Sequence, residues 1–78
     1  MSFTQPSRWI VVGATGVVGA EMLSLLAARG VPADNVSALG SERSAGRSVS
    51  YGSHSLHVEA ASSSDVPPGA IVLLAVGA

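Results

Sequence analysis

The sequence predicts an α/β fold with a mainly parallel sheet, and three observations indicate it. Residues 8–12, 36–39 and 71–76 are short apolar runs without alternation, which is typical of strands buried in a parallel sheet. A single amphipathic helix is expected between the first two runs, and turn residues separate the runs. Because a strand, a helix and a second strand in this order almost always form a right-handed parallel unit, we expect the helix to lie on one face of the sheet.

Length and composition limit the chain to one small domain. It has 78 residues, of which 47% are hydrophobic and 12% are charged, and its mean hydropathy is +0.48. The charged fraction is roughly half of the ~25% usual for soluble domains, which predicts apolar surface meant for a partner or for further chain. We therefore expect residues 1–78 to be a fragment of a larger protein.

Charge and residue usage exclude several classes of function. The net charge is −1, all four of the Lys and Arg positions are arginine, and there is no cysteine. This composition argues against a nucleic-acid partner and excludes, within these residues, a disulfide framework, a thiolate metal site and a cysteine nucleophile. Residues 9–28 are nearly apolar and as long as a membrane span, but Glu21 would cost roughly 2.5–3.5 kcal/mol near a bilayer centre. We therefore expect no membrane segment.

The sequence indicates an apolar face and a carboxyl-terminal end for the predicted helix. The residues that recur at helical spacing are Val18, Met22, Leu25 and Leu26, with Arg29 completing the row. We expect this row to face the sheet. Gly30 stands where a left-handed residue ends a helix, and Pro32 follows where the helix cannot continue.

The second half of the chain predicts further strands. Apolar residues alternate with polar ones on both sides of Gly52 and Ser53, which predicts a hairpin or paired edge strands. Residues 60–68 are rich in serine and proline and predict a connection with a short helical turn near Ser64. Residues 71–76 have the pattern of a central strand that helices cover on both faces of the sheet.

Three glycines at a spacing of three connect the first strand to the helix. Gly13 lets the chain turn out of the strand, Gly16 leaves room for a phosphate to approach the backbone amides, and Gly19 allows the helix to pack closely on the sheet. The start of the helix supplies unpaired N–H donors and a partial positive charge, and Thr15 adds a hydroxyl donor. This context predicts binding of a dinucleotide diphosphate by a partial Rossmann-like, doubly wound sheet.

The end of the second strand indicates which dinucleotide is bound. Arg43 can hold a phosphate through its planar guanidinium, and Ser41 and Ser44 add hydroxyl donors, which favours NADP over NAD. Glu42 is the opposing signal, because its carboxylate could bind a ribose hydroxyl or repel the phosphate. A solvated loop charge is the alternative for Arg43, and solvent exposure is the expectation for Arg47.

No metal site or catalytic cluster is predicted. His54 and His57 are three residues apart and would point to opposite faces of a strand, so a shared metal ion is not expected. We expect both histidines at the surface or in the hairpin.

Two motifs carry a resemblance to a known family. Residues 12–23 read VGATGVVGAEML and residues 41–47 read SERSAGR, and together they resemble the start of aspartate-semialdehyde dehydrogenase. The likeness covers nearly the whole chain and only the beginning of that family's proteins. By this resemblance Thr15, Gly16, Val17 and Val18 would hold the cofactor's diphosphate, and Arg43 with Ser44 its 2′-phosphate.

The resemblance also implies an activity. Enzymes of this family use NADPH to reduce aspartyl phosphate to aspartate 4-semialdehyde, reversibly, in amino-acid biosynthesis. In the family the cysteine nucleophile, the histidine and the substrate-binding arginines belong to later segments, so we expect this chain to be inactive by itself. The resemblance implies three partners, which are NADP(H), the remainder of the enzyme chain and further copies of the full-length enzyme. It also implies a location in the cytoplasm.

Three alternatives stay open at this stage. A related reductase that acts on N-acetyl-glutamyl phosphate has a similar glycine loop and similar chemistry. A non-catalytic NADP-sensing protein could be built on the same turn. A small structural domain whose glycine loop binds nothing is the third alternative.

Overall fold

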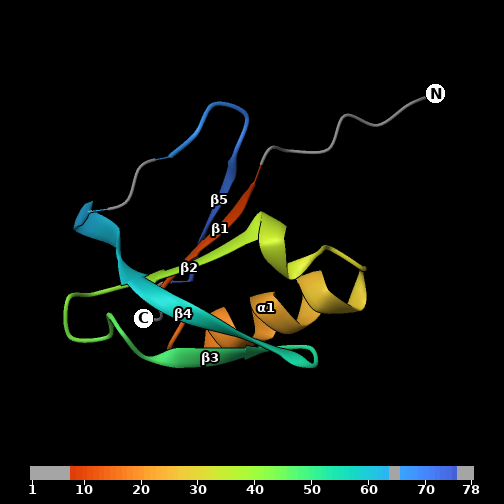
Figure 1. The fold of residues 1–78 in the computed structure, drawn as a ribbon, viewed down its shortest axis with the longest axis horizontal. Coiled ribbons are helices and arrows are strands. Elements are labelled where there is room, and N and C mark those ends of the chain that lie inside the picture. The colour runs from red at the N-terminus through yellow and green to blue at the C-terminus, as the bar shows by residue number, and fades with distance from the viewer. Residues whose placement is uncertain (1–7, 64–65, 76–78) are drawn as a thin grey trace.

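The computed structural model describes residues 8–63 and 66–75. Its strands are β1 (Trp9–Val12), β2 (Val36–Gly40), β3 (Ser48–Tyr51), β4 (His54–Ala60) and β5 (Ile71–Leu74). The α-helix of these residues is α1 (Val17–Ala28), and two 3-10 turns cover Ala33–Asn35 and Ala61–Ser63. The five strands form one sheet in the order β3-β4-β2-β1-β5 (Figure 1).

Most strand pairs in the sheet are parallel. β1 pairs with β2 on one side and with β5 on the other, and β2 pairs with β4, all three pairs being parallel. Only β3 and β4, joined by the predicted hairpin at Gly52 and Ser53, are antiparallel. This arrangement confirms the predicted α/β class with a mainly parallel, Rossmann-like sheet. The carboxyl ends of β1, β2 and β5 therefore meet at one edge.

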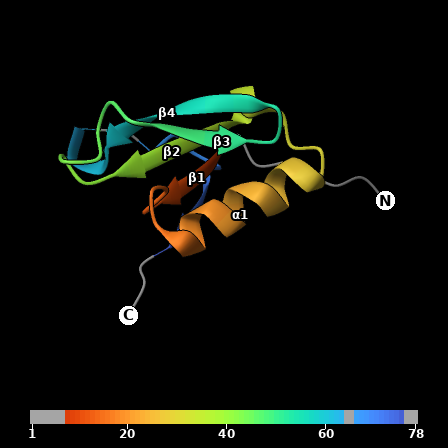
Figure 2. The ribbon, with the colours of Figure 1, turned by 90° about the horizontal axis from the view of Figure 1, so that it is seen from below.

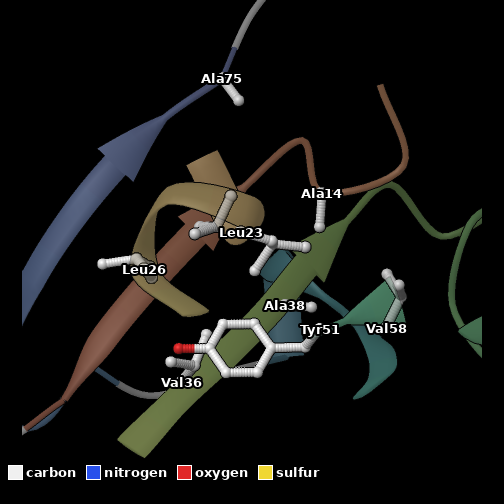
Figure 3. Close-up of a cluster of buried hydrophobic side chains, with 9 residues drawn as sticks. Ala14, Leu23, Leu26, Val36, Ala38, Tyr51, Val58 and Ala75 are labelled. Atoms are coloured by element: carbon white, nitrogen blue, oxygen red, sulfur yellow. The ribbon is translucent and has the colours of Figure 1, made fainter. Parts of the chain in front are cut away.

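Helix α1 packs along one face of the sheet (Figure 2). The buried cluster between them consists of Val11, Ala14, Leu23, Leu26, Val36, Ala38, Tyr51, Val58 and Ala75. Figure 3 shows these side chains converging from α1 and from several strands, with the Tyr51 ring beside Val36. The hairpin thus contributes Tyr51 to the same core that the parallel strands and the helix form.

The predicted face of α1 is wrong in three of its five positions, because Val18, Leu25 and the C-cap residue Arg29 are exposed. The helix buries Gly19, Leu23 and Leu26, whereas Val18 and Leu25 are 42% and 59% exposed. The helix is apolar nearly all round, so apolar spacing alone does not fix its rotation about its axis. The close approach at Gly19 fixes it, because residues four and seven positions after Gly19 then also face the sheet.

The predicted central position of the last strand is also wrong for this chain. β5 is an edge strand of the described sheet, and Ile71, Val72 and Leu74 are 40%, 42% and 64% exposed. Among residues 8–63 and 66–75 no strand pairs with its outer edge, and α1 covers one face only. Val76, which the prediction included, lies outside the described residues.

The end of α1 follows the prediction. Gly30 has φ +81°, its N–H donates to the Ala27 carbonyl, and the Val31 N–H donates to the Leu26 carbonyl, each at 3.1 Å. This pair of bonds is the Schellman arrangement that closes a helix at a left-handed residue. The 3-10 turn Ala61–Ser63 ends just before Ser64, which lies outside the described residues. No helix in the described part of the chain is long and apolar enough to cross a membrane.

Candidate functional site

The glycine loop is fastened to the end of β2. Gly13 has φ +87°, which directs the chain out of β1. The N–H groups of Gly13 and Ala14 both donate to the carbonyl oxygen of Leu39, at 2.9 and 3.1 Å. The Gly16 N–H donates to the Gly13 carbonyl at 3.1 Å and closes a turn inside the loop. The loop therefore has a fixed position relative to the second strand.

The structure explains the three glycines at positions 13, 16 and 19 in different ways. A Cβ at Gly13 would lie 2.6 Å from the carbonyl oxygen of Ala75, which follows β5. A Cβ at Gly19 would clash with the Gly13 carbonyl and lie 2.8 Å from the Cα of Ala14. At Gly16 the nearest atom is the Gly13 carbonyl oxygen at 3.5 Å, an ordinary contact. The fold thus requires glycine at the first and third positions, while a Cβ at the second would make only an ordinary contact.

The first amides of α1 have no acceptor in the part of the chain that the structure describes. Gly16 is the N-cap residue, with φ −84° and ψ 172°, and no side chain caps the helix. The Ala20 N–H makes the first helical bond, to the Gly16 carbonyl at 3.0 Å. Within the described residues, the N–H groups of Val17, Val18 and Gly19 have no backbone acceptor. These donors and the positive end of the helix dipole form a ready anion site.

The loop after β2 is held as firmly as the glycine loop. The N–H groups of Ser44 and Ala45 donate to the Ser41 carbonyl at 3.0 and 3.1 Å. The Gly46 N–H donates to the Val58 carbonyl, and the Val58 N–H donates to the Arg47 carbonyl, both at 2.8 Å. The first pair of bonds closes a turn at the start of the loop, and the second pair ties its end to β4.

Three hydroxyl groups join the two loops. The Oγ1 of Thr15 lies 3.3 Å from the Oγ of Ser44, which lies 3.3 Å from the Oγ of Ser41. A Cβ at Gly40 would come within 3.0 Å of the Ser44 Cβ, so glycine at the end of β2 gives Ser44 its place between the loops. The structure thus brings together Thr15, Ser41 and Ser44, which are up to 29 residues apart in sequence.

The charged residues of the site are exposed. Glu42, Arg43 and Arg47 are all exposed, as was predicted for Arg47. Within the described residues Arg43 has no hydrogen-bond or ion-pair partner, so its guanidinium is available to a ligand.

The two histidines lie away from this edge. His54 and His57 are exposed on β4, which confirms their predicted surface position. The described residues hold no group of three or more His, Cys, Asp or Glu side chains that could bind a metal ion.

Two groups of the site were not anticipated from the sequence. The Leu39 carbonyl anchors the glycine loop, and Gly40 makes room for Ser44. A backbone acceptor leaves no signal in a sequence, because every residue has one. Gly40, which ends β2 just before a serine-containing loop, is a signal that the sequence does contain.

The comparison with known families decides the assignment. The family described as "Semialdehyde dehydrogenase, NAD binding domain" matches residues 8–78. The chain belongs to this family. The chain is also similar to an aspartate-semialdehyde dehydrogenase of Synechocystis, 38% identical over 72 residues, which are 92% of this chain and 21% of that protein. The chain therefore spans about a fifth of the length of that relative.

Solved structures support the same assignment. Aspartate-semialdehyde dehydrogenase II of Vibrio cholerae, solved in complex with ASA, has a TM-score of 0.79 and 33% identity over 94% of this chain and 24% of its own. A probable aspartate-semialdehyde dehydrogenase of Pseudomonas aeruginosa has a TM-score of 0.69 and 39% identity over 78% of this chain and 18% of its own. The chain thus has the fold of part of these enzymes and spans about a fifth to a quarter of their length.

The residues of the glycine loop fit a dinucleotide. A diphosphate needs several donors and little steric bulk, and the loop offers three amides without a partner among the described residues, next to Gly16, which has no side chain. The fit does not depend on a cationic side chain, because the helix start supplies the positive potential.

Proposed function

We propose that this chain binds NADP and that residues 13–19 hold its diphosphate. The Val17, Val18 and Gly19 amides would donate to the phosphate oxygens, Gly16 would leave them room, and Thr15 would add a hydroxyl donor. The observation that carries this proposal is the set of unpartnered amides beside an uncrowded glycine.

The second loop is proposed to recognise the 2′-phosphate. Arg43 is exposed and without a partner in the described part of the chain, and the hydroxyls of Ser41 and Ser44 lie within one chain of contacts that starts at Thr15. A guanidinium and hydroxyl groups are the donors expected around a phosphate monoester. Glu42 is exposed on the same loop, and its position in solvent is compatible with such a site.

We place this chain at the amino terminus of an NADP-dependent aspartate-semialdehyde dehydrogenase. That enzyme converts L-aspartyl 4-phosphate to L-aspartate 4-semialdehyde reversibly, and bound NADPH supplies the hydride. The residues of this chain would bind and orient the adenosine half of the cofactor. The remainder of the enzyme chain, which would form homo-oligomers in the cytoplasm, would supply the nucleophile, since this chain has no cysteine.

Gly16→Ser tests the diphosphate site. Serine is a favoured N-cap residue, so its hydroxyl would accept a hydrogen bond from the Val18 or Gly19 amide and occupy the donors meant for phosphate. We expect unchanged or slightly increased thermal stability and an affinity for NADP, measured by calorimetry, that falls at least about tenfold.

Ala28→Ser adds a hydroxyl to an exposed position at the other end of α1 and serves as the matched control. It should leave the affinity for NADP unchanged. If Gly16→Ser binds NADP as well as the unsubstituted chain, the proposed diphosphate site is wrong.

A second assay addresses activity. The isolated chain should not oxidise aspartate semialdehyde in the presence of phosphate and NADP. Turnover by this polypeptide alone would contradict its proposed role as a binding segment.

A further inference from the structure

Ser44 lies at the only described link between the hydroxyls of the two loops. Its Oγ contacts both Thr15 Oγ1 and Ser41 Oγ at 3.3 Å, and within the described residues Thr15 and Ser41 contact each other only through it. Ser44 is half-buried, while Thr15 and Ser41 are exposed. The middle hydroxyl is thus held in place, and both outer hydroxyls can meet a ligand.

The number of protons in this chain of hydroxyls is limited. Each hydroxyl donates one hydrogen bond and accepts up to two. The three hydroxyls therefore have three protons, and the two contacts use two of them. Whichever way the contacts are directed, one proton is left for a ligand, at Thr15, at Ser44 or at Ser41.

The proposed nucleotide presents two phosphate positions to this one proton. The diphosphate would lie beside Thr15 at the start of α1, and the 2′-phosphate would lie beside Ser41, Arg43 and Ser44. A dinucleotide without the 2′-phosphate can take the free proton at Thr15 and leave both contacts intact. A dinucleotide with the 2′-phosphate can satisfy both positions only by breaking one contact.

The contacts are weak enough to be exchanged. Hydroxyl oxygens in a good hydrogen bond lie about 2.7–2.8 Å apart, and both contacts here are longer, at 3.3 Å. A hydrogen bond to an anionic oxygen is roughly twice as strong as one between neutral groups. A phosphate can therefore displace one of the hydroxyl contacts, but the loss of that contact reduces the net binding free energy of the phosphate.

We propose that Ser44 makes the two phosphate positions compete for one hydroxyl proton, so that this chain of hydroxyls lowers the preference for NADP over NAD that Arg43 provides. Ser44 is then a specificity-determining residue that couples the glycine loop to the loop after β2. This inference rests on the proposed function, because it requires both phosphate positions.

The test is a double-mutant cycle on the ratio of the NADP and NAD affinities of the 78-residue chain, measured by calorimetry. Thr15→Val removes one hydroxyl and one contact but keeps the shape of the side chain. The remaining pair of hydroxyls then has a proton free for the 2′-phosphate. Loss of the Thr15 donor to the diphosphate affects both nucleotides and cancels in the ratio.

The expected result depends on Ser44. With Ser44 present, Thr15→Val should raise the NADP to NAD affinity ratio by up to about fivefold, the worth of one hydroxyl contact. In the Ser44→Ala background Thr15 and Ser41 are no longer linked, so Thr15→Val should leave the ratio unchanged. A purely structural effect of either substitution would weaken both nucleotides alike and would not move the ratio.

Other outcomes separate the inference from the proposed function. If Thr15→Val leaves the ratio unchanged in both backgrounds, lowers it, or shifts it equally in both, the competition is refuted while nucleotide binding stands. If the unsubstituted chain binds neither NAD nor NADP, the proposed function is refuted and the inference falls with it.

Two controls complete the design. Ser50→Ala removes an exposed hydroxyl on β3 and should change neither affinity. Thermal melting of each variant reports folding, and Thr15→Ala repeats the cycle with a smaller side chain if Thr15→Val destabilises the chain.

Discussion

The hydroxyl of Tyr51 donates a hydrogen bond of 2.6 Å to the carbonyl oxygen of Val31. This bond joins the β3–β4 hairpin to the segment that leads from α1 into β2. Tyr51 is only 3% exposed, and its ring lies in the core beneath the helix. One residue thus connects the antiparallel hairpin to the parallel part of the fold.

Tyr51→Phe should destabilise the chain. The substitution keeps the ring but leaves the Val31 carbonyl without this donor, at an expected loss of about 1–2 kcal/mol. Urea denaturation followed by circular dichroism measures the change, with Ser50→Ala on the same strand as control. An unchanged denaturation midpoint would show that water replaces the hydroxyl at no net loss.

Stability should fall at alkaline pH through the same side chain. Burial raises the pKa of Tyr51 above its ordinary value of 10.0, so folding favours the protonated hydroxyl. The resulting stability is fully present below pH 10 and is lost as the pH rises through the pKa of the folded state. The chain has one tyrosine, no lysine and no cysteine, so no other side chain has an ordinary pKa in this range.

The measurement is the urea midpoint between pH 8 and about 11.5. The unsubstituted chain should lose stability toward the upper end, and Tyr51→Phe should give a flatter profile. Parallel profiles for the two proteins would rule out Tyr51 as the cause.

Gly13→Ala should be more destabilising than Gly30→Ala. Both glycines have positive φ, +87° and +81°, so an alanine at either position bears the same conformational strain, about 1–2 kcal/mol. At Gly30 there is no atom within 4 Å of the new Cβ, whereas at Gly13 the Ala75 carbonyl oxygen lies at 2.6 Å. The difference in Tm between the two variants measures the destabilisation caused by the steric clash at Gly13. Equal losses would mean that the chain after β5 moves aside freely.

Arg43→Ala should weaken the binding of NADP more than the binding of NAD. The proposed 2′-phosphate site loses its cation, so the affinity for NADP should fall by about tenfold or more while that for NAD changes little. Arg47→Ala is the matched control, because Arg47 is an exposed arginine of the same loop. Equal losses of both dinucleotides in Arg43→Ala would refute the 2′-phosphate role.

Much of the fold follows from local signals in the sequence. Gly30 ends α1 because a left-handed residue is needed there, and Gly52 with Ser53 forms the hairpin turn between alternating strands. The glycine loop is recognisable because Gly13 and Gly16 stand between β1 and α1 and Gly19 follows in the first turn of the helix. In each case residues that are close in the sequence are sufficient to determine the local conformation.

The features that sequence reasoning missed depend on contacts between distant residues. The rotation of α1 is set by the contact of Gly19 with Ala14, not by apolar spacing, since apolar residues surround the helix. The edge position of β5 depends on which strands pair with it, and an apolar run of six residues looks the same at an edge and at a centre. Thr15 and Ser44 are 29 residues apart in sequence, so the contact between their hydroxyls can be found only from the three-dimensional structure.

The double acceptance of hydrogen bonds by the Leu39 carbonyl has a kinetic consequence. Because this oxygen accepts hydrogen bonds from both the Gly13 and the Ala14 amides, the start of the loop is fixed to β2, and we expect the loop to change little when a nucleotide binds. Association then requires no slow rearrangement of the loop and proceeds on each productive collision. Variants that alter phosphate contacts should accordingly differ in how long the nucleotide stays bound, while their association rate constants remain similar.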